Sequence, residues 1–167
     1  RLALEIDLRT ALCAVLLSPE GYGGPRVLKE HTCLRSLLDR AGVIPAPPLL
    51  RSFAHPLIMR VALPELQELG QQLLAAVPPG GDAILTVEAH YVLAVAAFWR
   101  GDHVSAAGNF QIAVEAYRPE NAREHIKTYG QDPAAVCGVR LGYSLAIIDR
   151  PVEARRALEH GVAWAKS

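Results

Sequence analysis

The chain has 167 residues, of which 51% are hydrophobic and 6% aromatic, and its 17 basic side chains balance 17 acidic ones. A chain of this length can bury a substantial core, and the balanced charge argues against a surface dedicated to phosphate groups, so we expect no direct binding of nucleic acid. The sequence has no long uncharged apolar run and no signal-peptide layout, so we expect no membrane span and a cytoplasmic location.

A first pair of helices is predicted over residues 2–41. One face of its first helix, with apolar residues at steps of three and four, consists of Leu4, Leu8, Ala11, Leu12 and Val15. We expect the stretch 19–24 to break this helix, Pro25 to begin the next one and Gly42 to end it. The glycines between the helices lack the lysine and preceding strand of a phosphate-binding loop, so we interpret them as a turn.

A second pair is predicted over residues 48–77, after a proline-rich connector. Its short first helix, from Leu49 to Arg60, contains Pro56, which predicts a kink or a late start, because an interior proline removes a backbone hydrogen bond. The second helix ends in a proline- and glycine-rich stretch. Asp82 closes that stretch and is placed to cap the following helix.

The most regular pair covers residues 83–117. Gly101 is placed to end its first helix in the left-handed conformation, and Asp102 follows as the cap of the second. Small residues let the two helices approach, and Phe110 fills the gap between them. This spacing is the skeleton of a tetratricopeptide-type repeat, in which each unit is one helical hairpin.

The fourth pair, over residues 134–166, repeats this spacing after an insertion. We expect helical structure at 121–128 within the insertion and a turn at 129–133, because Gly130 frees the backbone there. Pro151 is expected to begin the last helix.

The run from Ala89 to Leu158 resembles the tetratricopeptide-like region of large bacterial signalling ATPases of the AAA/STAND type. Such regions follow a nucleotide-binding module and are fused to antibiotic-type transcriptional activators, LuxR-type regulators, class III cyclases or kinases. The most specific match is the segment 129–133, Tyr-Gly-Gln-Asp-Pro, and the turn at 21–25 also fits. The sequence departs from the pattern at 49–64, which is rich in proline, and at 147–149.

This resemblance implies an all-α fold, a TPR-like α-solenoid of about four antiparallel hairpins forming a single domain over residues 1–167. Because the chain opens inside a helical pattern without a start methionine, we expect it to be a piece of a longer protein. The implied function is a protein-interaction and regulatory module. Its partner would be another protein, or the neighbouring ATPase or effector domain of the same chain. Exposed hairpin ends would also allow a homodimer.

In a hairpin of this kind the first helix lines the concave groove. The positions expected there are Glu88, Tyr91, Val95, Phe98, Trp99, Val136, Val139, Tyr143, Ala146 and Ile147. An aromatic groove suits a helix or an extended peptide. A small-molecule effector held in the same groove is the alternative function. The favoured alternative for the side chains themselves is that they pack on neighbouring helices of the same domain.

The loop residues Tyr129, Gln131 and Asp132 form a second candidate site. They could contact a partner, but we favour Asp132 as the cap of the helix that begins near Pro133.

We find no pattern typical of an enzyme, a cofactor site or a metal site. The six histidines are scattered, and none is spaced to share a helix face with another. Glu124, His125 and Lys127 form a polar group near the loop, which we interpret as a solvated segment rather than an acid–base pair. The cysteines, Cys13, Cys33 and Cys137, are interpreted as reduced thiols.

Overall fold

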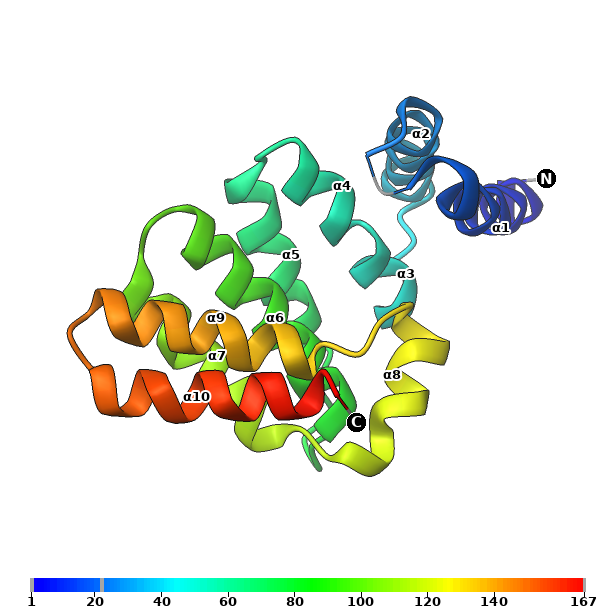
Figure 1. The fold of residues 1–167 in the computed structure, drawn as a ribbon. Coiled ribbons are helices and arrows are strands. Elements are labelled where there is room, and N and C mark those ends of the chain that lie inside the picture. The colour runs from blue at the N-terminus through cyan, green and yellow to red at the C-terminus, as the bar shows by residue number, and fades with distance from the viewer. Residues whose placement is uncertain (1, 22, 167) are drawn as a thin grey trace. The chain divides into compact units, whose positions relative to one another are not determined.

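The computed structural model describes residues 2–21 and 23–166, without the side chains of Ala14, Leu17 and Ser18. Every regular element within these ranges is a helix, which confirms the all-α prediction (Figure 1). The chain packs as two compact units, one up to Ala62 and one from Leu63 onward, and each is described by itself. The single domain predicted for the whole chain stays a prediction.

The first unit begins with two helices that pack against each other, α1 (Leu2–Glu20) and α2 (Pro25–Ala41). Pro25 is the first residue of α2, and Gly42 ends it in the left-handed conformation with φ 61°, as predicted. Helix α1 ends at Glu20, inside the stretch 19–24 that was predicted to break it, and Pro19 lies in its last turn. A proline in the last turn keeps a helical φ and disturbs only the final hydrogen bonds. Tyr22 in the turn lies outside the described residues.

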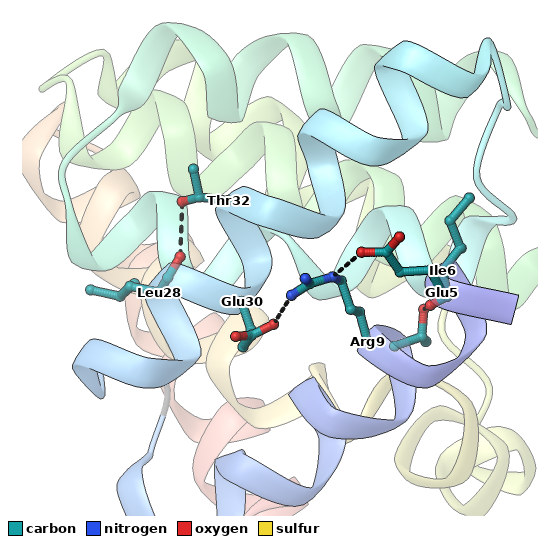
Figure 2. Close-up of polar contacts among 7 residues, drawn as sticks. Glu5, Ile6, Arg9, Leu28, Glu30 and Thr32 are labelled. Carbon is teal, nitrogen blue, oxygen red and sulfur yellow. Dashed lines mark hydrogen bonds and ion pairs between the residues drawn. The ribbon is translucent and has the colours of Figure 1, made fainter. Parts of the chain in front are cut away.

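A polar link holds α1 against α2 (Figure 2). The Arg9 guanidinium donates from Nε to Glu5 Oε1 at 3.1 Å, and from Nη1 to Glu30 Oε2 of α2 at 2.5 Å. On the same side of α1, Cys13 and Leu16 are buried. The apolar face identified in the sequence lies on the other side of the helix, where Leu4 and Leu8 are each 62% exposed and Val15 is 68% exposed.

The expected helix over 49–60 is interrupted. The structure has two short helices there, α3 (Pro47–Ser52) and α4 (Ala54–Met59), which meet at Phe53. The interruption follows from Pro56, which has no amide to donate to the carbonyl of Ser52. Phe53 and Leu57 are buried, and the ring of Phe53 meets His31 of α2 edge-on, with the centroids 5.4 Å apart.

The second unit contains five longer helices, each packed against the next of the five. They are α5 (Leu63–Ala75), α6 (Ala83–Trp99), α7 (His103–Ala116), α9 (Ala134–Ile147) and α10 (Pro151–Trp164). The insertion between α7 and α9 forms the short 3-10 helix η1 (Pro119–Asn121) and α8 (Ala122–Tyr129). Figure 1 shows α9 and α10 running side by side in opposite directions, joined by a short turn.

The predicted helix ends of this unit are confirmed. Asp82 accepts a hydrogen bond from the Leu85 amide at 3.0 Å, and Asp102 accepts one from the Ser105 amide at 3.1 Å. Gly101 adopts φ 82° between α6 and α7. Pro151 is the first residue of α10.

Small residues let α9 and α10 approach each other closely, as the repeat spacing predicted. A Cβ atom on Gly138 of α9 would lie 2.7 Å from the Cα of Gly161 on α10, too close for any real contact. The two backbones therefore touch directly at this point. Such a contact fixes the position of α9, which carries part of the candidate site.

Candidate functional site

The structure buries three of the predicted groove residues, all on α6. Glu88 and Val95 are 0% exposed and Tyr91 is 4% exposed. Since α6 packs against both α5 and α7, these side chains lie inside the unit and cannot contact a partner directly. These three side chains therefore pack within the unit. This is the alternative to groove binding that the sequence left open.

Three other predicted residues lie on the surface of the second unit. Trp99 at the end of α6 is 53% exposed, and Tyr143 and Ile147 of α9 are 56% and 60% exposed. The two α9 residues are four positions apart, which places them on one face of the helix. The remaining predicted residues of α6 and α9 are half-buried, Phe98, Val136 and Val139, or exposed, Ala146.

Arg140 connects the exposed residues of the two helices. Its guanidinium carbon lies 5.3 Å from the ring centroid of Phe98 and 5.5 Å from that of Trp99. Arg140 precedes Tyr143 by one helical turn, so it shares the face of α9 that carries Tyr143 and Ile147. We call the surface formed by Phe98, Trp99, Arg140, Tyr143 and Ile147 the aromatic face.

The aromatic face is anchored in the core through Phe98. The Phe98 ring meets Trp99 edge-on at 5.6 Å and the fully buried Phe110 at 6.4 Å between centroids. Rings held in this way lose little conformational freedom when a partner binds. Sequence reasoning missed Arg140, although its spacing from Tyr143 was a usable signal. Its Nη1 is buried and has no hydrogen-bond partner among the described residues.

A buried polar pair lies elsewhere in the same unit. His125 Nδ1 of α8 is 2.7 Å from Glu88 Oε1 of α6, and both side chains are almost completely buried, at 1% and 0% exposure. The interpretation of this segment as solvated is therefore wrong for His125, although Glu124 and Lys127 are exposed. His125 is the only buried residue of α8, so it anchors this helix to the unit.

The predicted loop site is tied to the same region. Asp132 Oδ1 accepts a hydrogen bond from the amide of Ala134, the first residue of α9, at 3.0 Å, which agrees with the favoured capping role, although Pro133 occupies the N-cap position itself. Its Oδ2 accepts a second bond from the Tyr117 hydroxyl at 2.8 Å, and the Tyr117 ring stacks on His125. Burial, and then the bond to Asp132, raise the pKa of Tyr117. Tyr129 and Gln131 are half-buried, so most of this loop faces the unit.

A shallow cleft of about 240 Å³ lies between α7, α9 and α10. Its lining includes Leu141, Leu145, Arg156, His160 and Trp164. Pockets for small molecules usually measure about 300–1,000 Å³, so this cleft suits a small ligand or a single side chain.

Among the described residues, no three His, Cys, Asp or Glu side chains converge on a point that could hold a metal ion. Burial raises the pKa of the Cys13 thiol to about 11, which keeps it protonated and unreactive at neutral pH. None of the described helices is both long and apolar enough to cross a membrane. The expectation of a protein without catalysis or cofactor stays an expectation.

Comparison with known proteins finds no matching family model, no similar curated protein and no similar solved structure. The resemblance to tetratricopeptide-like regions therefore rests on the residues of the chain itself.

Proposed function

We propose that this chain is the interaction and regulatory module of a larger signalling protein, and that it binds a segment of another protein on its aromatic face. The proposed architecture is a TPR-like solenoid. The stepwise packing of α5, α6, α7, α9 and α10, each against the next of these, supports it, because a solenoid contacts mainly its neighbours.

The observation that carries the proposal is the exposure of Trp99, Tyr143 and Ile147 around the Arg140 cation. Folded proteins rarely leave several large apolar side chains together on a surface without a partner. Tryptophan, tyrosine and arginine are also the residues that most often dominate the binding energy of protein interfaces. The face therefore combines the chemistry and the rigidity of a docking surface.

The chemistry of the partner follows from the same residues. An apolar side chain would lie against the exposed rings, and an acidic group would approach Arg140. In keeping with the resemblance, we place this segment in the neighbouring ATPase or effector domain, or in a separate regulatory protein. Signal transduction or transcriptional control would then depend on docking at this face.

The proposal is tested by placing a photo-crosslinking amino acid at Tyr143 in cells that make the protein. A discrete crosslinked product is expected from this position, and truncation of Trp99 to Ala should lower its yield by about tenfold or more. The same crosslinker at Val152 of α10, which is 66% exposed, is the matched control and should give no product. Equal products from both positions would show that the aromatic face has no special role.

A small-molecule effector is the second candidate function. The cleft between α7, α9 and α10 suits such a ligand better than the aromatic face does. Ligands of small size would be screened by the shift in melting temperature of the purified chain. A true ligand of the cleft should lose its shift in Arg156→Ala and keep it in Arg155→Ala, whose side chain does not line the cleft. A shift that survives Arg156→Ala would remove the cleft as the effector site.

A further inference from the structure

The cleft of about 240 Å³ in the second unit follows from the way its helices pack. Helix α9 packs against both α7 and α10, but no comparable packing joins α7 to α10 in the described part of the chain. Gln111 and Val114 of α7 therefore form one wall of the cleft, α10 supplies the opposite wall, and α9 lies between them as the floor.

The floor and one end of the cleft are apolar. Leu141 and Leu145 of α9 line the floor, four positions apart on one face of the helix, and are 3% and 4% exposed. At the C-terminal end of α10, the Trp164 ring lines the cleft and meets the Tyr117 ring, with the centroids 5.4 Å apart. This ring contact holds Trp164 in place, so the cleft offers a rigid apolar surface to a ligand.

Two charged side chains of α10, Glu153 and Arg156, line the same cleft. The Glu153 carboxylate is already bound, because it accepts hydrogen bonds from Arg150 Nε at 2.7 Å and from Arg150 Nη2. This contact, with a smaller contribution from Arg156, lowers the pKa of Glu153 and keeps it negative at neutral pH. The exposed Arg156 guanidinium forms no ion pair with any residue that the structure describes.

We propose, as an extension that rests on the second candidate function, that this cleft binds a small monocarboxylic acid with an aromatic or branched apolar body. The body lies over Leu141 and Leu145 and against Trp164. The carboxylate binds Arg156, whose planar guanidinium can hold both of its oxygens. Because Glu153 repels a second negative charge beside Arg156, one carboxylate is preferred to two, and to a phosphate group.

Intrinsic fluorescence of the whole chain tests the proposal. In Trp99→Phe, Trp164 is the only tryptophan, since the sequence contains two. The probe is 3-phenylpropanoate at neutral pH, and its matched controls are 3-phenylpropanol, which has no charge, and benzylmalonate, which has two carboxylates. We expect a saturable change in Trp164 fluorescence with 3-phenylpropanoate, and binding about tenfold or more weaker for both controls.

Further variants locate the contact. Arg156→Gln should weaken the binding of 3-phenylpropanoate about tenfold or more, whereas Arg155→Gln, which changes an exposed arginine outside the lining, should not. Glu153→Gln should strengthen the binding of benzylmalonate, because it removes the repelling charge. In Trp164→Phe, the remaining Trp99 should not respond to the probe.

The possible failures are distinguishable. No saturable response, equal binding of the alcohol, or an Arg156→Gln chain that binds as tightly as the parent would overturn the monocarboxylate as ligand. If another small molecule perturbs Trp164 and depends on Arg156, the cleft stays an effector site but this ligand class is wrong. A response of Trp99 in place of Trp164 would overturn the cleft itself, and none of these results bears on the docking of a protein at the aromatic face.

Discussion

Helices α6 and α1 have similar sequences in one respect, because both carry apolar residues all round, but their surroundings differ. In α6, residues on opposite sides such as Val87, Val92 and Val95 are all buried, since α5 and α7 cover the helix from two directions. In α1, only the side that meets α2 is buried, and the other side remains exposed. The comparison teaches that apolar residues on several sides of a helix are all buried only where helices flank it on more than one side: α6 has both α5 and α7, whereas α1 packs on α2 within its unit.

The two helices also differ in how polar groups fix them. In α6, Glu88 lies inside the unit and pairs with His125, whereas in α1 the ion pair of Arg9 with Glu30 is partly exposed. A buried pair is costly to break because the remaining group is left without a partner. The partly exposed pair mainly sets which side of α1 faces α2.

The largest expected effect comes from breaking the buried pair of α6. Glu88→Ala leaves His125 buried without its partner and should lower the free energy of unfolding by about 3–5 kcal/mol. Glu124→Ala, an exposed carboxylate on α8, is the control and should change stability little. Chemical denaturation of both variants provides the measurement. Equal stability of Glu88→Ala and wild type would mean that His125 does not depend on this carboxylate.

The next effect separates the two sides of α1. Leu16→Ala removes a buried side chain and should cost about 2–4 kcal/mol. Leu8→Ala removes an exposed one and should change stability by less than about 0.5 kcal/mol in the monomer. Both are compared by denaturation at low protein concentration. The assignment of inner and outer sides would fail if Leu8→Ala cost as much as Leu16→Ala.

A smaller effect is expected at the loop before α9, where Asp132 accepts a hydrogen bond from Tyr117, whose ring stacks on His125 of the buried pair. Asp132→Ala removes the cap of α9 and the acceptor of Tyr117, and should cost about 1–2 kcal/mol. Glu159→Ala, which removes an exposed carboxylate of α10, is the control. Thermal melting of the two variants measures the difference. Unchanged melting of Asp132→Ala together with lost partner binding would contradict the capping role.

The smallest effect is a dependence on pH. The pKa of Tyr117 is raised in the folded chain, so its stabilising contribution is complete below the ordinary value of 10.0 and is lost as the pH rises above it. Wild-type stability should therefore fall more steeply above about pH 10 than that of Tyr117→Phe. Denaturation curves between neutral and alkaline pH compare the two. Parallel pH profiles would show that this hydroxyl titrates normally.

The sequence predicted the helix ends well because the signals are local. Asp82, Asp102, Gly101 and Pro151 act within one turn of their own positions, and the structure places each as expected. The outward side of α1 could not be predicted, since either side of this helix is apolar enough to be buried. The choice depends on Arg9 meeting Glu30, which comes from another helix.

The candidate site was predicted only in part for the same reason. Trp99, Tyr143 and Ile147 were identified from their repeat positions, but the burial of Glu88 and Tyr91 follows from packing between helices, which spacing does not show. The pairing of Glu88 with a residue 37 positions later could not be read from local patterns. Contacts between residues far apart in the sequence, such as this pair, decide which of the predicted residues are buried and which stay on the surface.

The chain offers a direct test of the central claim, because it contains two tryptophans, one on the aromatic face and one in the cleft of α10. Both would be replaced by 5-fluorotryptophan, and the two fluorine resonances assigned with Trp99→Phe and Trp164→Phe. The labelled chain would then be titrated with the protein captured by the crosslinker at position 143. We predict that the Trp99 resonance shifts or broadens while that of Trp164 stays in place; a Trp99 resonance unchanged at saturation, or a shift of Trp164 alone, would contradict the assignment of function to the aromatic face.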